Sequence, residues 1–389
     1  MMTNTADALY VHDLSRELLL LLHLLGKRQL DTEALRPLTA DLDWALFNKL
    51  VVHHRVVPPV YLALQEHSAL VPEHVIPFLH RHYHQNMMKM LHLGRAMSQV
   101  REAFEHSGIR SLWLKGPLLA LQLYGDMARR SSKDLDVLVD DRDVEKAREI
   151  LIELGYVPEE EWLLNNWKRK SHHLSMEHPE HGVQVEIHWQ LSPHSGKDCT
   201  FDDLWSRRKE IVLSGQSFYG IGGEDLLHYL AKHGARHGWF RLRWLLDIAD
   251  LLPQSSSANM IAHLKLHGGR HYIGQALLLS GQLLSAAVPK ALADETVSVR
   301  SYRLAGMALH YIKRMVQLNP VPEKSVAWHY HRYLFLLMSG KQRVAYIAGK
   351  LLPSSRDALM LPLPKPLRFL YYPLRPFLWF WRRMKQPSL

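Results

Sequence analysis

Apolar side chains recur at helical spacing in both end regions of this 389-residue chain. The leucines between Leu18 and Leu25 stand at positions i, i+3, i+4 and i+7, which is the pattern of an amphipathic helix. Helical spacing also covers residues 75–100, and it returns from residue 226 to about residue 352. We therefore expect mainly helical N-terminal and C-terminal regions.

The middle of the chain has a different pattern, in which short apolar runs alternate with helical segments. Three runs are typical of strands, and two segments between them have helical spacing: 109–114, 134–139 and 183–191 for the strands, 118–124 and 144–154 for the helices. This alternation predicts an α+β fold in which a mixed sheet is embedded between helical regions. The expected regions are helical 1–98, an α/β core at 99–215, helical 216–352 and a tail at 353–389.

Acidic side chains gather on the polar faces of two of the predicted strands. Asp134 and Asp136 are two residues apart, so their side chains point to the same side of an extended strand. Glu186 and His188 have the same relation in the run VQVEIHW. Three carboxylates that converge repel one another unless protons or a cation neutralise them, and oxygen ligands suit Mg²⁺ or Mn²⁺. The alternative for the Asp pair alone is a solvated strand edge.

A lysine and a glycine precede the acids in the segment LKGP. Gly116 allows backbone amides to approach a phosphate, and the helix that follows directs the positive end of its dipole to the same place. Lys115 adds a full positive charge. This turn, about twenty residues before the paired acids, is a candidate nucleotide-binding site.

Taken together, these segments resemble the uncharacterised nucleotidyltransferase family over roughly residues 40–260. The resemblance rests on the run LKGPLLALQLYGDMARRSSKDLDVLV, on VQVEIHW and on the helical LLHYLAKHGARHGWFRLRWLLDIADLL. It implies the nucleotidyltransferase core and transfer of a nucleoside monophosphate from a nucleoside triphosphate to an unknown small-molecule, sugar or peptide hydroxyl.

Carried onto this sequence, the resemblance makes Asp134, Asp136 and Glu186 the catalytic metal ligands for Mg²⁺ or Mn²⁺. Lys115 and Gly116 match the nucleotide-binding turn, where the wider superfamily has Gly-Ser. The third acid is often Asp, and Glu186 reaches further to the same ion.

Three nearby residues have both a nucleotide-binding and a structural interpretation. Arg130 is placed to offset charge on the leaving pyrophosphate, or to form a salt bridge. Tyr124 can stack on a base or pack in the core, and His188 can bind phosphate, orient Glu186 or be structural.

Histidine clusters occur outside the core motifs. Lys232, His233, Arg236 and His237 share a probable helix, where we favour a phosphate-binding or product-binding face over a purely structural role. The His pair has zinc-ligand spacing but lacks the acid of the metalloprotease pattern. Asp247 is expected to pair with a neighbouring arginine. His172, His173, His178 and His181 are expected in a solvated loop.

Charge and cysteine content limit the possible partners and the cellular compartment. Six of the net +10 charges lie after residue 357, which leaves +4 for the rest and argues against nucleic-acid binding. The single cysteine, Cys199, excludes an internal disulfide and fits a reducing cytoplasm. The basic, aromatic composition of the tail is typical of contact with an anionic partner or a membrane, here peripherally at the inner face, and the alternative is a segment that packs back on the body. The alternative function is therefore a catalytically inactive scaffold protein of a membrane-associated biosynthetic complex.

Overall fold

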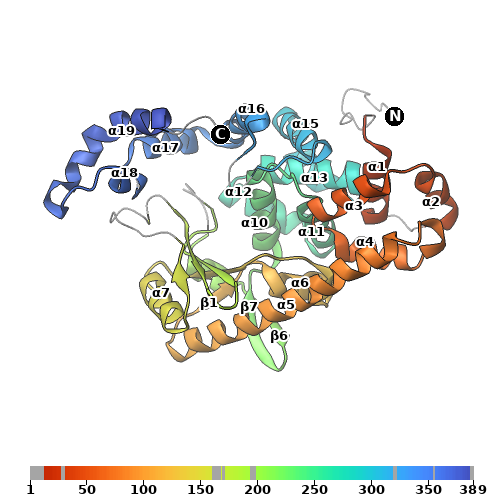
Figure 1. The fold of residues 1–389 in the computed structure, drawn as a ribbon, viewed down its shortest axis with the longest axis horizontal. Helices are drawn as coiled ribbons and strands as arrows, with labels where there is room; N and C mark the ends of the chain where they lie inside the picture. Colours follow the sequence, from red (N-terminus) through yellow and green to blue (C-terminus); the bar gives the residue numbers. More distant parts are fainter. Residues whose placement is uncertain are drawn as a thin grey trace.

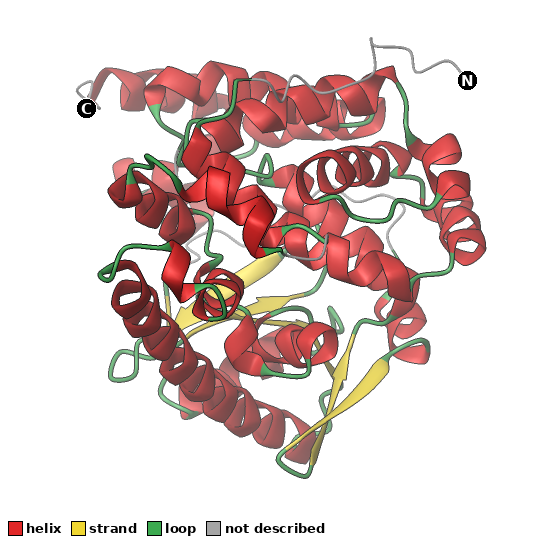
Figure 2. Ribbon diagram, turned by 90° about the vertical axis from the view of Figure 1, so that its right-hand side faces the viewer, coloured by secondary structure: helices red, strands yellow, loops and turns green. Residues whose placement is uncertain are grey.

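Helices surround a single mixed sheet in this protein (Figures 1 and 2). The structure, a computed structural model, describes residues 13–27, 31–159, 168, 171–192, 199–318, 322–353 and 355–385. The α+β fold predicted from the alternating pattern is confirmed.

The described part of the N-terminal region contains the helices α1 (Arg16–Leu25), α2 (Thr32–Thr39), α3 (Trp44–His53), α4 (Val57–Gln65) and α5 (Val75–His106). Side-chain caps mark where α1 and α3 begin, because Ser15 and Asp43 each accept a hydrogen bond from an amide of the first turn. The long helix α5 packs on α4 at one end and on α6 and α7 further along (Figure 1). It therefore links the helical region to the sheet.

The sheet has seven strands in the order β3-β4-β5-β2-β1-β7-β6. The three predicted strands are confirmed as β1 (Ser111–Trp113), β2 (Leu135–Val139) and β5 (Gln184–His188). Four further strands are β3 (Val157–Pro158), β4 (His173–Glu177), β6 (Lys209–Leu213) and β7 (Gln216–Gly220). Since β7 pairs in parallel with β1, the sheet continues past residue 215.

Two parallel strands occupy the middle of the sheet and position the polar residues. β2 and β5 run side by side with Asp136 opposite Glu186 and Leu138 opposite His188. The alternate residues Leu135, Val137 and Val139 are buried in the core beneath the sheet. The helices of this unit are α6 (Gly116–Tyr124), α7 (Val144–Glu153) and α9 (Phe201–Ser206).

The C-terminal helices lie above the sheet in the view of Figure 1. They are α10 (Gly223–Arg236), α11 (Leu242–Leu251), α12 (Ser257–His267), α13 (Arg270–Leu284), α14 (Lys290–Thr296), α15 (Val299–Lys313), α16 (Lys324–Leu337) and α17 (Gly340–Leu351). One large hydrophobic core joins the helices from α10 to α16 to α1, α3 and α4. The two helical regions that are distant in sequence therefore form one packed body.

The tail forms two more helices, α18 (Ser355–Met360) and α19 (Tyr371–Lys385). Arg375 of α19 donates to both carboxylate oxygens of Asp357 in α18 at 2.6 Å, and this ion pair is buried. Pro376 lies inside α19. Among the described helices, none is at once long and apolar enough to cross a membrane.

Candidate functional site

Two carboxylates meet where β2 and β5 lie in register. Asp136 is almost completely buried, and Glu186 stands directly opposite it on the neighbouring strand. His188 joins them, because its Nε2 lies 3.1 Å from Asp136 Oδ1 and 3.3 Å from Glu186 Oε2. Ligand atoms of these three side chains all lie within 4.8 Å of one another. The parallel register thus brings together acids that are 50 positions apart in sequence.

The Lys-Gly turn reaches the same point. Gly116 has a φ of +73°, a conformation that L side chains rarely adopt, which explains the glycine at the start of α6. The preceding Lys115 extends its ammonium to within 3.0 Å of Asp136 Oδ1. The predicted nucleotide-binding turn therefore lies next to the predicted metal ligand.

Burial and charge act in opposite directions on these groups. Burial alone would raise the pKa of Asp136, but Lys115 and His188 outweigh it and hold the pKa well below its usual range. Burial likewise opposes ionisation of Glu186, whose pKa is nevertheless lowered by the hydrogen bond from His188. The pKa of His188 is raised, since its two carboxylate partners outweigh desolvation. The site therefore holds ionised carboxylates at neutral pH.

Asp134 lies one residue before β2, at the rim of this group. Burial and the neighbouring charge of Asp136 raise its pKa, with Lys115 and Arg243 acting in the opposite direction. It is outside the two sets of three described residues whose ligand atoms lie within 4.8 Å of one another. Its role as a metal ligand remains a prediction.

Arg130 and Tyr124 both bind Asp247 of α11. Arg130 Nε and Nη2 each donate to a different oxygen of Asp247 at 2.9 Å, and both side chains are 1% exposed. The hydroxyl of Tyr124 donates to Asp247 Oδ1 at 3.2 Å. Asp247 thus pairs with an arginine, as expected, but this arginine lies 117 positions away and is not a neighbour in the sequence. The charge of Arg130 is thus neutralised within the protein, whereas its contact with pyrophosphate and the stacking of Tyr124 on a base remain predictions.

The expectation of a solvated loop is wrong for two of the four histidines. His173 begins β4 and stands opposite His188, and His172 just before it is buried. These two side chains and His188 form the second set whose ligand atoms lie within 4.8 Å of one another. The alternation of Leu174 and Met176 with polar residues is the signal that could have revealed this strand.

The polar residues at the C-terminal end of α10 are two cations and two histidines, of which His237 directly follows the helix. Lys232, Arg236 and His237 line a cavity of about 470 Å³ that His172 and His173 also line. Burial lowers the pKa of His233 and His237 well below the ordinary value, so both imidazoles are neutral at pH 7. The positive charge of this face therefore comes from Lys232 and Arg236.

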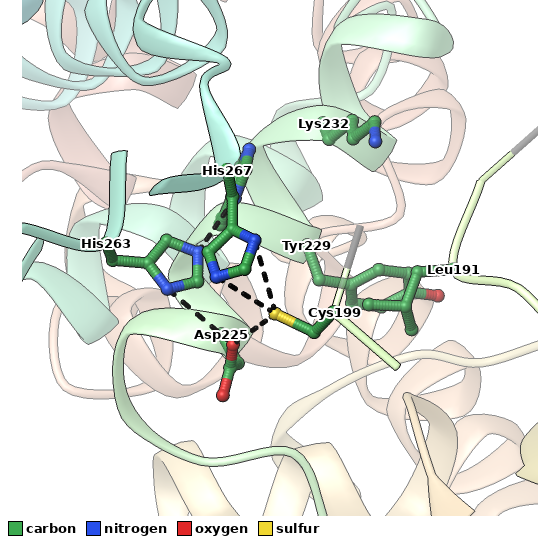
Figure 3. Close-up of a pocket in the computed structure, with 8 residues that line it drawn as sticks. Leu191, Cys199, Asp225, Tyr229, Lys232, His263 and His267 are labelled. Carbon is green, nitrogen blue, oxygen red and sulfur yellow. Dashed lines mark hydrogen bonds and ion pairs between the residues drawn. The ribbon is translucent and has the colours of Figure 1, made fainter. Parts of the chain in front are cut away.

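A second hollow lies near the start of α10 and is shown in Figure 3. Cys199 donates to Asp225 at 3.3 Å, and its sulfur lies 3.5 Å from His267 Nε2. Burial and the carboxylate of Asp225 raise the pKa of the thiol to about 12, so it is protonated at neutral pH. The hollow has a volume of about 20 Å³, which is room for one water molecule and too small for a nucleotide.

Comparisons with known proteins agree with the geometry at the sheet centre. Residues 40–285 match the family described as "Uncharacterised nucleotidyltransferase". No curated protein and no solved structure matches the chain. The family match includes every element that contributes to the site, from the Lys-Gly turn to α11. This chain therefore belongs to the uncharacterised nucleotidyltransferase family.

Proposed function

We propose that this protein transfers a nucleoside monophosphate from a nucleoside triphosphate to an acceptor hydroxyl, with Mg²⁺ or Mn²⁺ as cofactor. The observation that carries the proposal is the registration of Asp136 with Glu186 beside Lys115. In the reaction, the acceptor oxygen bonds to the α-phosphorus and the bond to the β-phosphate oxygen breaks. Pyrophosphate leaves, and the hydroxyl proton is lost.

The residues present fit a divalent metal ion. Asp136 Oδ2 is buried and makes no hydrogen bond within the described part of the chain. A buried carboxylate oxygen normally has a partner, and a bound cation would provide one. Asp136 and Glu186 would hold the ion, and Asp134 would complete the oxygen ligands from the rim. The ion would supply Lewis acidity at the phosphate oxygens and a lower pKa for the acceptor hydroxyl.

The protein's own groups orient the reactants around these carboxylates. His188 bridges Asp136 and Glu186 through one nitrogen and so limits the rotation of both side chains. Lys115 carries a positive charge at the glycine turn, where the first amides of α6 are available to a phosphate. Positioning and electrostatic stabilisation of this kind supply most of the catalysis in phosphoryl and nucleotidyl transfer.

Calorimetric titration with each nucleoside triphosphate and Mg²⁺ tests the proposal. We expect saturable binding, and a loss of affinity of more than about 100-fold in the Asp134→Asn, Asp136→Asn double variant, because ligand carboxylates matter more than their supporting groups. Asp143→Asn is the matched control, since this nearby side chain makes no capping hydrogen bond to α7. Equal affinity in the double variant and the control would refute the metal site. Pyrophosphate release in the presence of host extracts then identifies the acceptor.

We propose that the tail contacts a membrane surface peripherally, at the inner face if the protein is cytoplasmic. Three aromatic side chains of the tail, Phe369, Phe377 and Phe380, are 63%, 72% and 59% exposed. Exposed aromatic residues in a segment with basic residues favour the interface of an anionic bilayer. The same contact would serve the alternative function, a scaffold without catalysis.

Liposome flotation tests this contact. We expect Phe377→Ser, Phe380→Ser to reduce co-flotation with anionic vesicles, whereas Val299→Ser, at an apolar side chain 87% exposed on α15, should not. Unchanged flotation of the double variant, or flotation equal on neutral vesicles, would exclude the proposed contact.

A further inference from the structure

The cavity beside the carboxylates has the dimensions of a small-molecule site. Its volume of about 470 Å³ lies in the range of roughly 300–1,000 Å³ that is typical of ligand pockets. It lies between α10 and the later helices α13, α16 and α17, with the start of β4 on the side of the sheet, and it is open to solvent on one side. A ligand could therefore enter it from solution.

The two sides of the cavity differ in chemistry. Lys232, Arg236 and the two histidines at β4 form a polar wall, whereas the facing helix α16 contributes Tyr330, Leu334 and Leu337. The described lining residues include these two cations and no aspartate or glutamate. A ligand that matches both walls carries a negative group on an apolar or aromatic body.

Arg236 is the cation whose surroundings indicate an anion. Its Nη1 lies 2.9 Å from His172 Nε2, and because a guanidinium can only donate, the imidazole must accept. Among the described residues no carboxylate lies within salt-bridge distance of Arg236, in contrast to Arg130, which binds Asp247. Burial lowers the pKa of Arg236, and the more distant Tyr330 and Glu186 offset only part of that effect.

The polar wall also adjoins the reaction centre. His173 lines the cavity, and its Nε2 lies 3.8 Å from Glu186 Oε2. A molecule held at Arg236 would therefore extend past His173 toward the carboxylates.

From this arrangement we infer that the cavity is the acceptor site, and that the acceptor is a small molecule with a carboxylate or phosphate group on an apolar body. The anionic group binds at Arg236, and the apolar body lies against Tyr330 and Leu334. The assignment of the bound molecule as the acceptor rests on the proposed function. The binding of such an anion does not, since it requires neither metal nor nucleotide.

Titration calorimetry of the full chain, without metal or nucleotide, tests the inference with four probes. Phenyl phosphate and benzoate carry an anionic group on an aromatic ring, phenol lacks the charge and inorganic phosphate lacks the ring. We expect phenyl phosphate or benzoate to bind more tightly than phenol and inorganic phosphate, and the better of the two identifies the anionic group. Arg236→Gln should weaken this binding about tenfold or more, the loss expected for one charge-assisted hydrogen bond. Arg303→Gln, on the exposed face of α15, is the matched control.

Two further variants keep the result decisive. Met338→Trp places bulk in the cavity without removing charge and should abolish binding of the ring-bearing anion even if Arg236→Gln perturbs folding. Asp136→Asn should lose binding of a nucleoside triphosphate with Mg²⁺ but retain the anion. Equal affinity for phenol, or a parallel loss of nucleotide affinity in Arg236→Gln, would overturn the inference, the latter by making the cavity the nucleotide site. Failure of metal-dependent nucleotide binding alone would instead refute the proposed function.

Discussion

The buried pair of Arg130 and Asp247 provides the sharpest test of how this site is built. Two parallel hydrogen bonds of 2.9 Å join the side chains, and both are 1% exposed. Asp247→Asn leaves the guanidinium charge buried without a counter-charge. Breaking a buried ion pair in this way costs about 3–5 kcal/mol of unfolding free energy. That is a large part of the roughly 5–15 kcal/mol by which a typical protein is stable.

The pair should behave as a unit in a double-mutant cycle. Arg130→Met alone leaves the buried Asp247 carboxylate without its cation, with the hydroxyl of Tyr124 still donating to it, so a comparable loss is expected. The double variant Arg130→Met, Asp247→Leu replaces both charges by apolar groups. Its loss of unfolding free energy should therefore be smaller than the sum of the losses in the two single variants. Urea unfolding followed by circular dichroism measures each free energy.

Arg129→Met is the control, because this neighbouring arginine is exposed. Its unfolding free energy should stay within about 0.5 kcal/mol of the unaltered protein. The structural reasoning fails if Arg130→Met and Asp247→Asn are both as stable as this control. If they are, and binding of a nucleoside triphosphate with Mg²⁺ is nevertheless weakened in Arg130→Met, then Arg130 acts on the phosphates instead.

Three other predictions concern charge, titration and packing. Lys115→Met removes the ammonium 3.0 Å from Asp136 and should lower the free energy of unfolding by about 3–5 kcal/mol. Added Mg²⁺ should then raise the melting temperature of the variant more than that of the unaltered protein. An equal effect of Mg²⁺ on both proteins would contradict this. Burial and Arg300 lower the pKa of His271 from 6.5 to about 4, so stability is complete above pH 6.5 and falls as the pH drops toward 4, by up to roughly 3 kcal/mol. His271→Gln should flatten that fall in acid urea titrations, and an unchanged slope would exclude His271 as its source. Gly274→Ala places a methyl group 2.2 Å from the backbone oxygen of Thr296 and should cost more than about 1–3 kcal/mol, whereas Gly306→Ala, with open space around it, should cost nothing.

Local pattern was sufficient where a segment carries its own periodicity. The strands at 109–114, 134–139 and 183–191 and the long helix from residue 75 were predicted because apolar spacing reports which face is buried. The strand β4 was not predicted, because a cluster of histidines is typical of a loop and the sequence does not show which strand would pair with this segment. Its stability comes from pairing with β5.

The α+β architecture, the Lys-Gly turn and the candidate ligands Asp134, Asp136 and Glu186 could all be predicted from residue patterns alone. The position of Glu186 opposite Asp136 is visible only in the folded protein, since register between strands depends on packing of both faces and not on either strand alone. Only the folded protein likewise shows that Arg130 binds Asp247 and that Arg236 does not bind a carboxylate within the described chain. Ion pairs between distant segments depend on how the helices pack against one another, and residue spacing along the chain does not indicate that packing.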